Sequence, residues 1–236
     1  GRAWIFGDRD CSVQRRHQKL IEECPAPGLT EAQRTILHDS ARSLVETLKY
    51  RGAGTVEFLV DKQSGDVVFL EVNARIQVEH PITEEAYGVD LVAAQLQLAL
   101  GQEVELPDVA PVPAAAAFEI RINAEDPANN FMPSPGTIQV AHFPSGPGIR
   151  VDSHVYDGYR FPPYYDSLLG KLIVRAHNRD AALRAVLAAV RQVRIEGIKT
   201  TLNMSEMVLA HPDFAAGGVS TTWFAPVWEA HQQEKK

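Results

Sequence analysis

Apolar residues recur at helical spacing in the first part of the chain. Thr30 and Gln33 have the spacing of a capping box, in which the side chain of each residue accepts a hydrogen bond from the backbone N–H of the other at the start of a helix. The helix that follows ends before the glycines at positions 52 and 54, because glycine is unfavourable inside helices. A second helix is predicted over residues 83–100, with a cap at Thr83 and an end at Gly101. The predicted apolar face of the first helix consists of Ile36, Leu37, Ala41, Leu44, Val45 and Leu48.

The last part of the chain predicts two more helices. Asp180 caps the longer one, and Asn203 with Glu206 caps a shorter one. The apolar face of the longer helix consists of Leu183, Val186, Leu187, Val190 and Val193.

Alternating branched and aromatic residues predict strands between these helices. Residues 55–60 and 67–72 form a hairpin with a three-residue loop, 63–65, in which Gly65 takes the left-handed conformation. Residues 118–123 alternate as another strand. We therefore predict the α+β fold class. Short strands separated by Pro/Gly turns continue to Val174 and include residues 137–142 and 149–153.

A Pro/Ala/Val-rich segment at residues 107–113 lacks periodicity and is typical of a linker. It divides the chain into two predicted domains, residues 1–106 and residues 114–228. Residues 229–236 are predicted as a polar tail.

Composition and charge narrow the class of protein. The net charge of −7 argues against a broad nucleic-acid surface, since phosphate binding depends on clustered positive charge. No run of about 18 apolar residues is present, and the N-terminus lacks the design of a signal peptide, so no membrane partner is expected. Cys11 and Cys24 make no metal-ligand spacing. We expect reduced thiols and a cytoplasmic location, or the mitochondrial matrix in a eukaryote.

Two glutamates of the hairpin are candidates for metal binding. The predicted loop places Glu57 directly opposite Glu71, where two like charges repel. A hard cation with oxygen ligands, such as Mg²⁺ carrying nucleotide phosphates, would offset the repulsion. The alternative is that both glutamates lie on a solvated face of the sheet.

The segment after the hairpin has polar residues at every second position. Such a row can bind a cation at one end and a small oxyanion at Arg75, with Glu79 near the oxyanion as a base. Alternation alone is equally typical of a solvated sheet face. The row consists of Glu71, Asn73, Arg75, Gln77 and Glu79.

Two further sets of polar residues have ordinary alternatives. The basic cluster of Arg15, Arg16, His17 and Lys19 is typical of a solvated patch unless a triphosphate lies nearby. Arg121 shares the outward side of its predicted strand with Glu119 and Asn123. A surface ion pair is the common role of an arginine in such a position.

Five motifs resemble those of the biotin carboxylase family in order and spacing. The resemblance spans nearly the whole chain. It implies the second half of an ATP-grasp domain followed by the biotin carboxylase C-terminal α+β domain. The motifs are QRRHQK at 14–19, GAGTVEF at 52–58, EVNARIQVEHP at 71–81, RINAED at 121–126 and PPYYDS at 162–167.

The resemblance implies a metal and nucleotide site. Mg²⁺ or Mn²⁺ would bridge ATP phosphates between Glu57, Glu71 and Asn73. Lys19 would also assist phosphoryl transfer, which needs charge neutralisation. The implied nucleotide contacts are Gln14, His17, Lys19, Leu59, Glu57 and Glu71.

The resemblance also implies roles in the chemistry of bicarbonate and biotin. Arg75, Gln77 and the backbone of Val78 would hold bicarbonate, and Glu79 would deprotonate it. Bicarbonate then attacks the γ-phosphate to give carboxyphosphate, which breaks down to CO₂ and phosphate. The phosphate takes the proton from biotin N1, and Arg121 would stabilise the biotin enolate.

Two departures from the family pattern concern completeness and assembly. The family's N-terminal domain and ATP lid are not in this sequence, and no other segment makes a glycine-rich phosphate loop. We therefore expect the missing N-terminal half as a partner. Gly146–Gly148 stands before Arg150 where bacterial stand-alone subunits carry a bulkier aromatic residue, so the mode of homo-oligomer formation is left open. The pattern looks closer to acyl-CoA, methylcrotonyl-CoA and pyruvate carboxylase subunits.

The remaining partners and the alternatives follow from what the sequence lacks. No biotinylation site is present, so biotin would arrive on a carboxyl carrier domain, and a separate carboxyltransferase would choose the acceptor. A non-catalytic assembly module and another ATP-grasp carboxylate ligase remain alternative functions. Glu79 and Arg121 favour the carboxylase over the other ligase. Tyr165 and Asp166 are as consistent with a packed turn as with catalysis.

Overall fold

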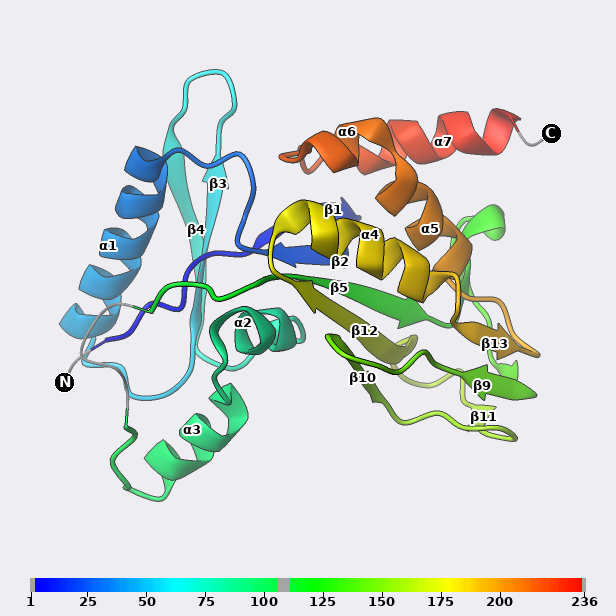
Figure 1. Cartoon of the computed structure of the whole chain (residues 1–236), viewed down its shortest axis with the longest axis horizontal. Coiled ribbons are helices and arrows are strands. Elements are labelled where there is room, and N and C mark those ends of the chain that lie inside the picture. Colours follow the sequence, from blue (N-terminus) through cyan, green and yellow to red (C-terminus); the bar gives the residue numbers. More distant parts are fainter. Residues whose placement is uncertain (1–2, 106–110, 235–236) are drawn as a thin grey trace.

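Five antiparallel strands form the central sheet of the computed structural model, which describes residues 3–105 and 111–234 (Figure 1). The sheet joins strands from both predicted domains, since β2 pairs directly with β5. In spatial order, the strands are β1 (Asp10–Arg15), β2 (Gln18–Cys24), β5 (Ala116–Asn123), β12 (Leu168–Ala176) and β10 (Ile149–Ser153).

One face of the sheet packs against α4 and the C-terminal helices (Figure 1). Phe118, Ile120 and Ile122 alternate along β5 and are fully buried there with Val186 and Phe214. This large apolar core follows from the two-residue period of the strand. The helices are α4 (Arg179–Val190), α5 (Leu202–Ala210), α6 (Pro212–Ala216) and α7 (Phe224–Glu234).

The opposite face of the sheet is covered by α2 (His80–Tyr87), through a small cluster that includes Ile82, Ala117 and Ile173. The prediction of one helix over residues 83–100 is wrong. Gly88 takes a left-handed conformation, with φ of 68°, and ends α2.

A second short helix, α3 (Leu91–Ala99), then starts at its own cap, because the Asp90 side chain accepts a hydrogen bond from the Ala93 amide at 2.7 Å. Helix α2 also begins three residues earlier than predicted, at His80, because a proline is favourable in the first turn of a helix.

The hairpin of β3 (Thr55–Val60) and β4 (Val67–Asn73) lies beside α1 (Glu31–Thr47) (Figure 1). The capping box that starts α1 is confirmed. The three-residue hairpin loop is wrong, because the amide of Asp61 donates to the carbonyl of Asp66 at 2.9 Å and leaves a four-residue loop, residues 62–65.

Short strands complete the C-terminal region. The predicted strand over 137–142 is wrong because the chain changes partners within it, and the two halves pair with different strands. The predicted strand over 149–153 is confirmed as β10. The short elements are β6 (Glu125–Asp126), η1 (Pro127–Asn129), β7 (Met132–Pro133), β8 (Gly136–Thr137), β9 (Val140–His142), β11 (Arg160–Phe161) and β13 (Arg194–Glu196).

Two predicted helix caps are wrong by about one turn or less. Asn178, not Asp180, caps α4, because its side chain accepts from the amide of Ala181 at 2.9 Å. Asp180 instead lies in the first turn, where a negative charge is favourable. The cap of α5 is Thr201, and Asn203 lies inside the helix.

Residues 107–110 of the predicted linker lie outside the described residues, and residues 111–113 have no regular structure. Helix α7 continues through Glu234, so it includes most of the predicted polar tail, of which residues 235–236 are not described. Cys11 and Cys24 are both free, as predicted.

Among the described residues, no helix has both the length and the apolar character needed to cross a membrane.

Candidate active site

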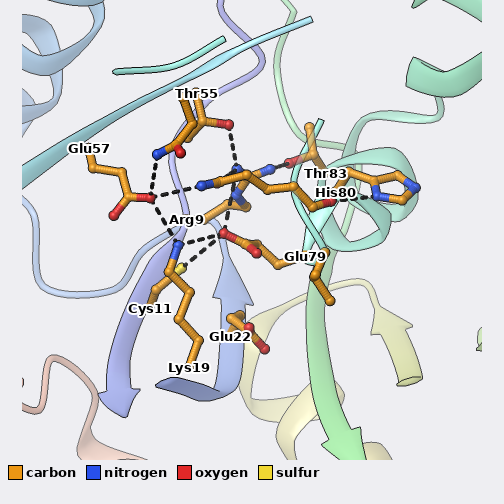
Figure 2. Close-up of polar contacts among 12 residues, drawn as sticks. Arg9, Cys11, Lys19, Glu22, Thr55, Glu57, Glu79, His80 and Thr83 are labelled. Carbon is orange, nitrogen blue, oxygen red and sulfur yellow. Dashed lines mark hydrogen bonds and ion pairs between the residues drawn. The ribbon is translucent and has the colours of Figure 1, made fainter. Parts of the chain in front are cut away.

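The predicted site residues converge where the hairpin, β1, β2, β5 and the start of α2 meet (Figure 2). Lys19 reaches into this junction from β2, Glu57 from β3 and Arg121 from β5. Glu79 immediately precedes α2 and contacts both Lys19 and Arg121. The structure therefore brings together residues as much as 102 positions apart, Lys19 and Arg121.

A β-bulge places the two acidic residues of the hairpin on the same face. Glu57 pairs with Glu71, whereas Phe58 pairs with Phe69, so Leu70 is an extra residue on β4. With the observed four-residue loop and no bulge, Glu57 would face Leu70, and the side chain of Glu71 would point to the other face. The predicted pairing of Glu57 with Glu71 is confirmed, but it depends on this bulge.

The residues present fit a hard cation at the hairpin. The Asn73 Nδ2 atom lies between the two carboxylates, 3.2 Å from Glu57 Oε1 and 2.9 Å from Glu71 Oε1. The two opposed carboxylates suit Mg²⁺, which commonly takes one or two carboxylates and completes its shell with phosphate and water. An amide would bind such a cation through its oxygen, whereas the Asn73 nitrogen donates to both carboxylates here. No group of three or more His, Cys, Asp or Glu residues suited to a metal occurs among residues 3–105 and 111–234.

The predicted polar row does not continue as a strand. Strand β4 ends at Asn73, and the chain then leaves the hairpin and turns into α2. The prediction of one extended polar face is therefore wrong. Gln77 and Glu79 are buried, while Arg75 is exposed and donates to the carbonyl of Ile76 at 3.1 Å.

Glu79 is a buried carboxylate with cations on both of its oxygens. Lys19 Nζ lies 2.7 Å from Oε1, and Arg121 Nη2 lies 2.9 Å from Oε2. Burial by itself would raise the pKa of Glu79, but the charges of Arg9 and Lys19 and the hydrogen bond from Lys19 outweigh it and lower the pKa. Glu79 is therefore ionised at neutral pH and can accept a proton.

Lys19 connects the base to the acidic hairpin. Its Nζ atom also lies 3.2 Å from Glu57 Oε1, the oxygen that accepts a hydrogen bond from Gln77 Nε2 at 2.8 Å (Figure 2). A single ammonium group thus balances charge on both carboxylates. This position suits neutralisation of negative charge during phosphoryl transfer.

Arg121 lies on a buried face, contrary to the outward position predicted for it. Glu119 and Asn123, its neighbours on that face, are 0% and 1% exposed. The reason is tertiary, because β5 is the middle strand of the sheet and α2 covers this side. Arg121 donates from Nε to Glu22 Oε1 at 2.6 Å as well as to Glu79.

The other predicted nucleotide contacts lie on the rim of the junction. Gln14 is the cross-strand partner of Lys19. Arg16 and His17 form the exposed turn between β1 and β2 with positive φ values of 47° and 66°. Leu59 is exposed on β3, two residues beyond Glu57 and so on the same face of the strand.

Residues missed from the sequence at the junction include Arg9 and Lys171. Arg9 donates to Thr83, Thr55 and Gln77 at 3.0–3.2 Å, and so ties α2 to the hairpin (Figure 2). Lys171 lies on β12, the strand next to β5, and donates to the Val78 carbonyl at 2.8 Å. A lone lysine within the apolar run of β12 was a usable signal, whereas Arg9 stands in a segment without periodicity.

Tyr165 and Asp166 line the cavity that also contains Lys19, Glu79 and Arg121, without a hydrogen bond to these residues in the described part of the chain. Tyr165 is 85% exposed, and the Asp166 carboxylate accepts a hydrogen bond from the nearby amide of Leu168 at 2.9 Å. The local hydrogen bond agrees with a turn, but the exposed tyrosine does not pack on the sheet.

Two family models and several known proteins match this chain. A family model described as "Biotin carboxylase C-terminal domain" matches residues 119–226, and one described as "Carbamoyl-phosphate synthase L chain, ATP binding domain" matches residues 1–107. A biotin carboxylase of Nostoc sp. is 46% identical over 218 residues, which is 92% of this chain and 48% of that protein. The biotin-dependent acyl-coenzyme A carboxylase alpha3 subunit of Mycobacterium leprae is 45% identical over 97% of this chain and 38% of that protein.

A solved structure supports the same relationship. The biotin carboxylase domain of the 2-oxoglutarate carboxylase of Hydrogenobacter thermophilus, a dimer in complex with MgADP, ADP and bicarbonate, superposes with a TM-score of 0.90. It is 39% identical, and the match covers 94% of this chain and 50% of that one. The chain spans about half the length, or less, of the relatives it matches. The near-equal identities to a protein named biotin carboxylase and to an acyl-coenzyme A carboxylase alpha3 subunit do not separate these two types.

Proposed function

Since the chain belongs to the biotin carboxylase family, we propose that it supplies the metal-binding and bicarbonate-activating part of an enzyme that carboxylates biotin. The reaction would consume ATP and bicarbonate and pass through carboxyphosphate. The observation that carries the proposal is the buried carboxylate of Glu79, held between Lys19 and Arg121, with Lys19 also bound to Glu57. This arrangement links the predicted metal ligands, base and biotin-binding residue in one network.

The nucleotide would bind over the hairpin. Glu57, Glu71 and Asn73 would hold Mg²⁺ or Mn²⁺, which would neutralise phosphate charge and orient the γ-phosphate. ATP would also be contacted by side chains from β1, β2 and the turn between them, and from β3. These are Gln14, His17, Lys19 and Leu59. The similar domain of Hydrogenobacter thermophilus is a complex with MgADP, which supports this proposal.

Bicarbonate would bind at the turn before α2. Arg75 would leave the carbonyl of Ile76 and, with Gln77 and the backbone of Val78, hold the anion. Glu79 would accept the bicarbonate proton as a bicarbonate oxygen attacks the γ-phosphorus and ADP departs. The resulting carboxyphosphate would break down to CO₂ and phosphate.

The phosphate would then accept the proton from N1 of biotin, and the N1 would attack CO₂. Arg121 would stabilise the negative oxygen of the biotin ureido group during this step. Its side chain is available for that role because it is only partly buried and already lies 2.9 Å from Glu79.

The partners in the proposal are a biotin carboxyl carrier domain, a carboxyltransferase and the other half of a biotin carboxylase. Large apolar side chains exposed on α1, the hairpin and α3 support the last of these, because extended apolar surface is typical of an interface. We propose that the N-terminal half covers them. They are Ile36, Leu48, Leu59, Val68, Phe69, Leu70, Val72, Val92, Leu96 and Leu100.

A homo-oligomer and a cytoplasmic or matrix location remain part of the proposal. The similar domain of Hydrogenobacter thermophilus is a dimer, which supports the first, and the two free cysteines of this chain support the second.

Bicarbonate-dependent ATP cleavage tests the proposed function. The chain would be assayed with Mg²⁺ and free biotin, both alone and joined to the N-terminal half of the Nostoc relative. We expect the joined form to be active. Absence of bicarbonate-dependent cleavage in both forms, with the complete Nostoc enzyme active in the same assay, would contradict the proposal.

Variants of the joined form test the assigned roles. Glu79→Gln should abolish bicarbonate-dependent ATP cleavage while MgATP binding persists, because only the proton acceptor is lost. Glu85→Gln, a change on α2 outside the network, is the matched control. Undiminished turnover of Glu79→Gln would remove Glu79 from the role of base.

Arg121→Ala should reduce biotin carboxylation more than ATP cleavage, because Arg121 is assigned to biotin. Equal losses in the two reactions would contradict this assignment. The two rates are measured on the same preparation by the release of phosphate and by the fixation of labelled bicarbonate.

A further inference from the structure

Two glutamates lie opposite each other inside the protein, behind Arg121. Glu22 on β2 and Glu119 on β5 are direct cross-strand partners, and both side chains are 0% exposed. The Cβ atoms of such partners lie about 4.5–5.5 Å apart, so the two carboxyl groups are within reach of each other. Neither residue has a task in the proposed reaction.

The hydrogen bonds of this pair are incomplete. Among the described residues, Glu22 Oε2 and both carboxyl oxygens of Glu119 are buried without a hydrogen-bond partner. Buried polar atoms without partners are rare because each one costs about 1–3 kcal/mol. Two adjacent acidic side chains with this defect suggest a proton that joins them.

The nearby cations contact groups other than Glu119. Arg121 donates to Glu22 Oε1 and Glu79, and Lys171 donates to the Val78 carbonyl, with Asp152 3.6 Å away. The other charged groups that act on the pair are Lys19 on β2 and Glu79 before α2.

In the described part of the chain, no cation makes a hydrogen bond or ion pair with Glu119, although Lys171 and Arg121 act on it from a distance. Its ionisation would therefore leave a buried charge without a direct partner beside Glu22.

We propose that Glu119 is a neutral carboxylic acid that donates its proton to Glu22 Oε2, and that this acid–carboxylate pair positions Arg121. One proton then satisfies Glu22 Oε2 and one oxygen of Glu119 together. Burial raises the pKa of Glu119 well above its usual range, and the neighbouring Glu22 raises it further. Burial also raises the pKa of Glu22 to about 7, although Arg121 opposes this shift.

The pair would fix the direction of the Arg121 guanidinium. Glu22 Oε1 lies 2.6 Å from Nε and 2.5 Å from Nη2, so it holds one edge of the group from behind. With Glu119 neutral, the pair carries one negative charge and matches the one positive charge of Arg121. The consequence for biotin rests on the proposed function, because the orientation of Arg121 matters only if Arg121 meets the substrate.

Infrared spectroscopy of the 236-residue chain tests the shared proton without any activity. Ordinary carboxyl groups are ionised at neutral pH, whereas burial raises the pKa of Glu22 and of Glu23 to about 7, so both can add protonated-acid absorption. We therefore expect the C=O absorption of protonated carboxylic acids to lose one component in Glu119→Gln. The glutamine can still donate to Glu22 Oε2. The matched control is Glu84→Gln, which removes a buried glutamate whose carboxylate is paired with Arg150 at 2.7 Å and should leave the band unchanged.

Protonated-acid absorption that is unchanged in Glu119→Gln, or absent from the unsubstituted chain, would overturn the shared proton. If Glu119→Gln does not fold, carbon-13 NMR of glutamate-labelled unsubstituted chain decides the same point. At neutral pH we then expect a protonated side-chain carboxyl signal, and a spectrum with ionised glutamates alone would overturn the proposal.

Kinetics of the form joined to the Nostoc half test the positioning of Arg121. Glu22→Gln should raise the KM for biotin roughly tenfold, the factor that corresponds to about 1.4 kcal/mol of lost interaction. Bicarbonate-dependent ATP cleavage without biotin should change little. Glu119→Gln should keep the KM near its original value at neutral pH, because its amide preserves the hydrogen bond.

The outcomes separate the two proposals. Equal effects of Glu22→Gln on biotin KM and on ATP cleavage would overturn the positioning role, as a general loss of structure would affect both. If the unsubstituted joined form were inactive, the proposed function would fail, while the infrared band would still decide the acid–carboxylate pair.

Discussion

The central sheet and the β3–β4 hairpin contain similar residues in very different surroundings. Both have branched and aromatic side chains in alternation, but Phe118 on β5 is 0% exposed and Phe69 on β4 is 53% exposed. The sheet is covered on both faces by packed helices. Beside the hairpin lies α1, in which Leu37 is the buried residue. The comparison teaches that alternation predicts a strand, while burial depends on what the fold places over the strand.

The residues of the candidate site therefore come from two regions that are packed differently, the central sheet and the hairpin. Arg121 and the backbone contact to Val78 come from the packed sheet, which has a large apolar core. The predicted metal ligands Glu57 and Glu71 come from a two-stranded hairpin, and isolated hairpins are marginally stable. We therefore expect the two halves of the site to respond differently to changes in packing.

The largest effect should come from truncating equivalent aromatic residues in the two regions. Phe118→Ala should lower the free energy of unfolding by about 3–5 kcal/mol, because it removes a fully buried ring from the core. Phe69→Ala should cost less than about 1 kcal/mol, because half of the ring is already in water.

Urea unfolding of the chain, followed by circular dichroism, measures both values. Similar losses for the two variants would show that the hairpin is as firmly packed as the sheet, and would break the comparison. The pair is matched because each change removes the same atoms from a strand.

A smaller effect should appear in the pH dependence of stability, and it concerns the sheet alone. A native Glu119 that keeps its proton, while the unfolded chain loses it near pH 4.3, binds more protons folded than unfolded. Stability then falls as pH rises above that value, by about 1.4 kcal/mol per pH unit for one proton, until the folded pKa is reached. Glu119→Gln cannot titrate and should escape this loss.

The measurement is urea unfolding of the chain and of Glu119→Gln at several pH values from 5 to 7. The difference in stability should grow in favour of the variant as pH rises. Parallel curves would mean that Glu119 is ionised in both states. The hairpin variant Glu71→Gln is the control, because Glu71 is exposed.

Local features were predictable from the sequence where their causes are local. The capping box at Thr30 and Gln33 depends on residues three apart, and it is confirmed. The boundary between α2 and α3 also has local causes, the left-handed Gly88 and the cap at Asp90. Both residues are visible in the sequence, but the prediction of one helix over residues 83–100 runs through them, because a single glycine is tolerated inside many helices.

The site divides in the same way. The opposition of Glu57 and Glu71 followed from hairpin pairing, although the bulge at Leu70 that preserves it was not foreseen. The burial of Arg121 could not follow from its strand, because it depends on α2 packing over β5. Glu22 was missed for the same reason, since its contact with Arg121 joins residues 99 positions apart.

The smallest effect should come from removing a helix cap in each region. Thr30 accepts a hydrogen bond from the Gln33 amide at 3.2 Å, and Asn178 accepts one from the Ala181 amide at 2.9 Å. Each substitution by alanine should cost about 1 kcal/mol. The two losses should nevertheless appear in different measurements, because α1 is loosely packed and α4 is part of the core.

In α4, four buried side chains couple the helix to the sheet, so Asn178→Ala should lower the global stability measured by urea. In α1, which buries one, Thr30→Ala should instead speed hydrogen exchange in the first turn, with little change in the urea midpoint. A local opening of this kind stays local only if the hairpin and α1 are not cooperative with the sheet. If Thr30→Ala lowered the global free energy of unfolding by the whole cost of the cap, about 1 kcal/mol, the exposed hairpin and the buried sheet would unfold as one unit despite their different packing.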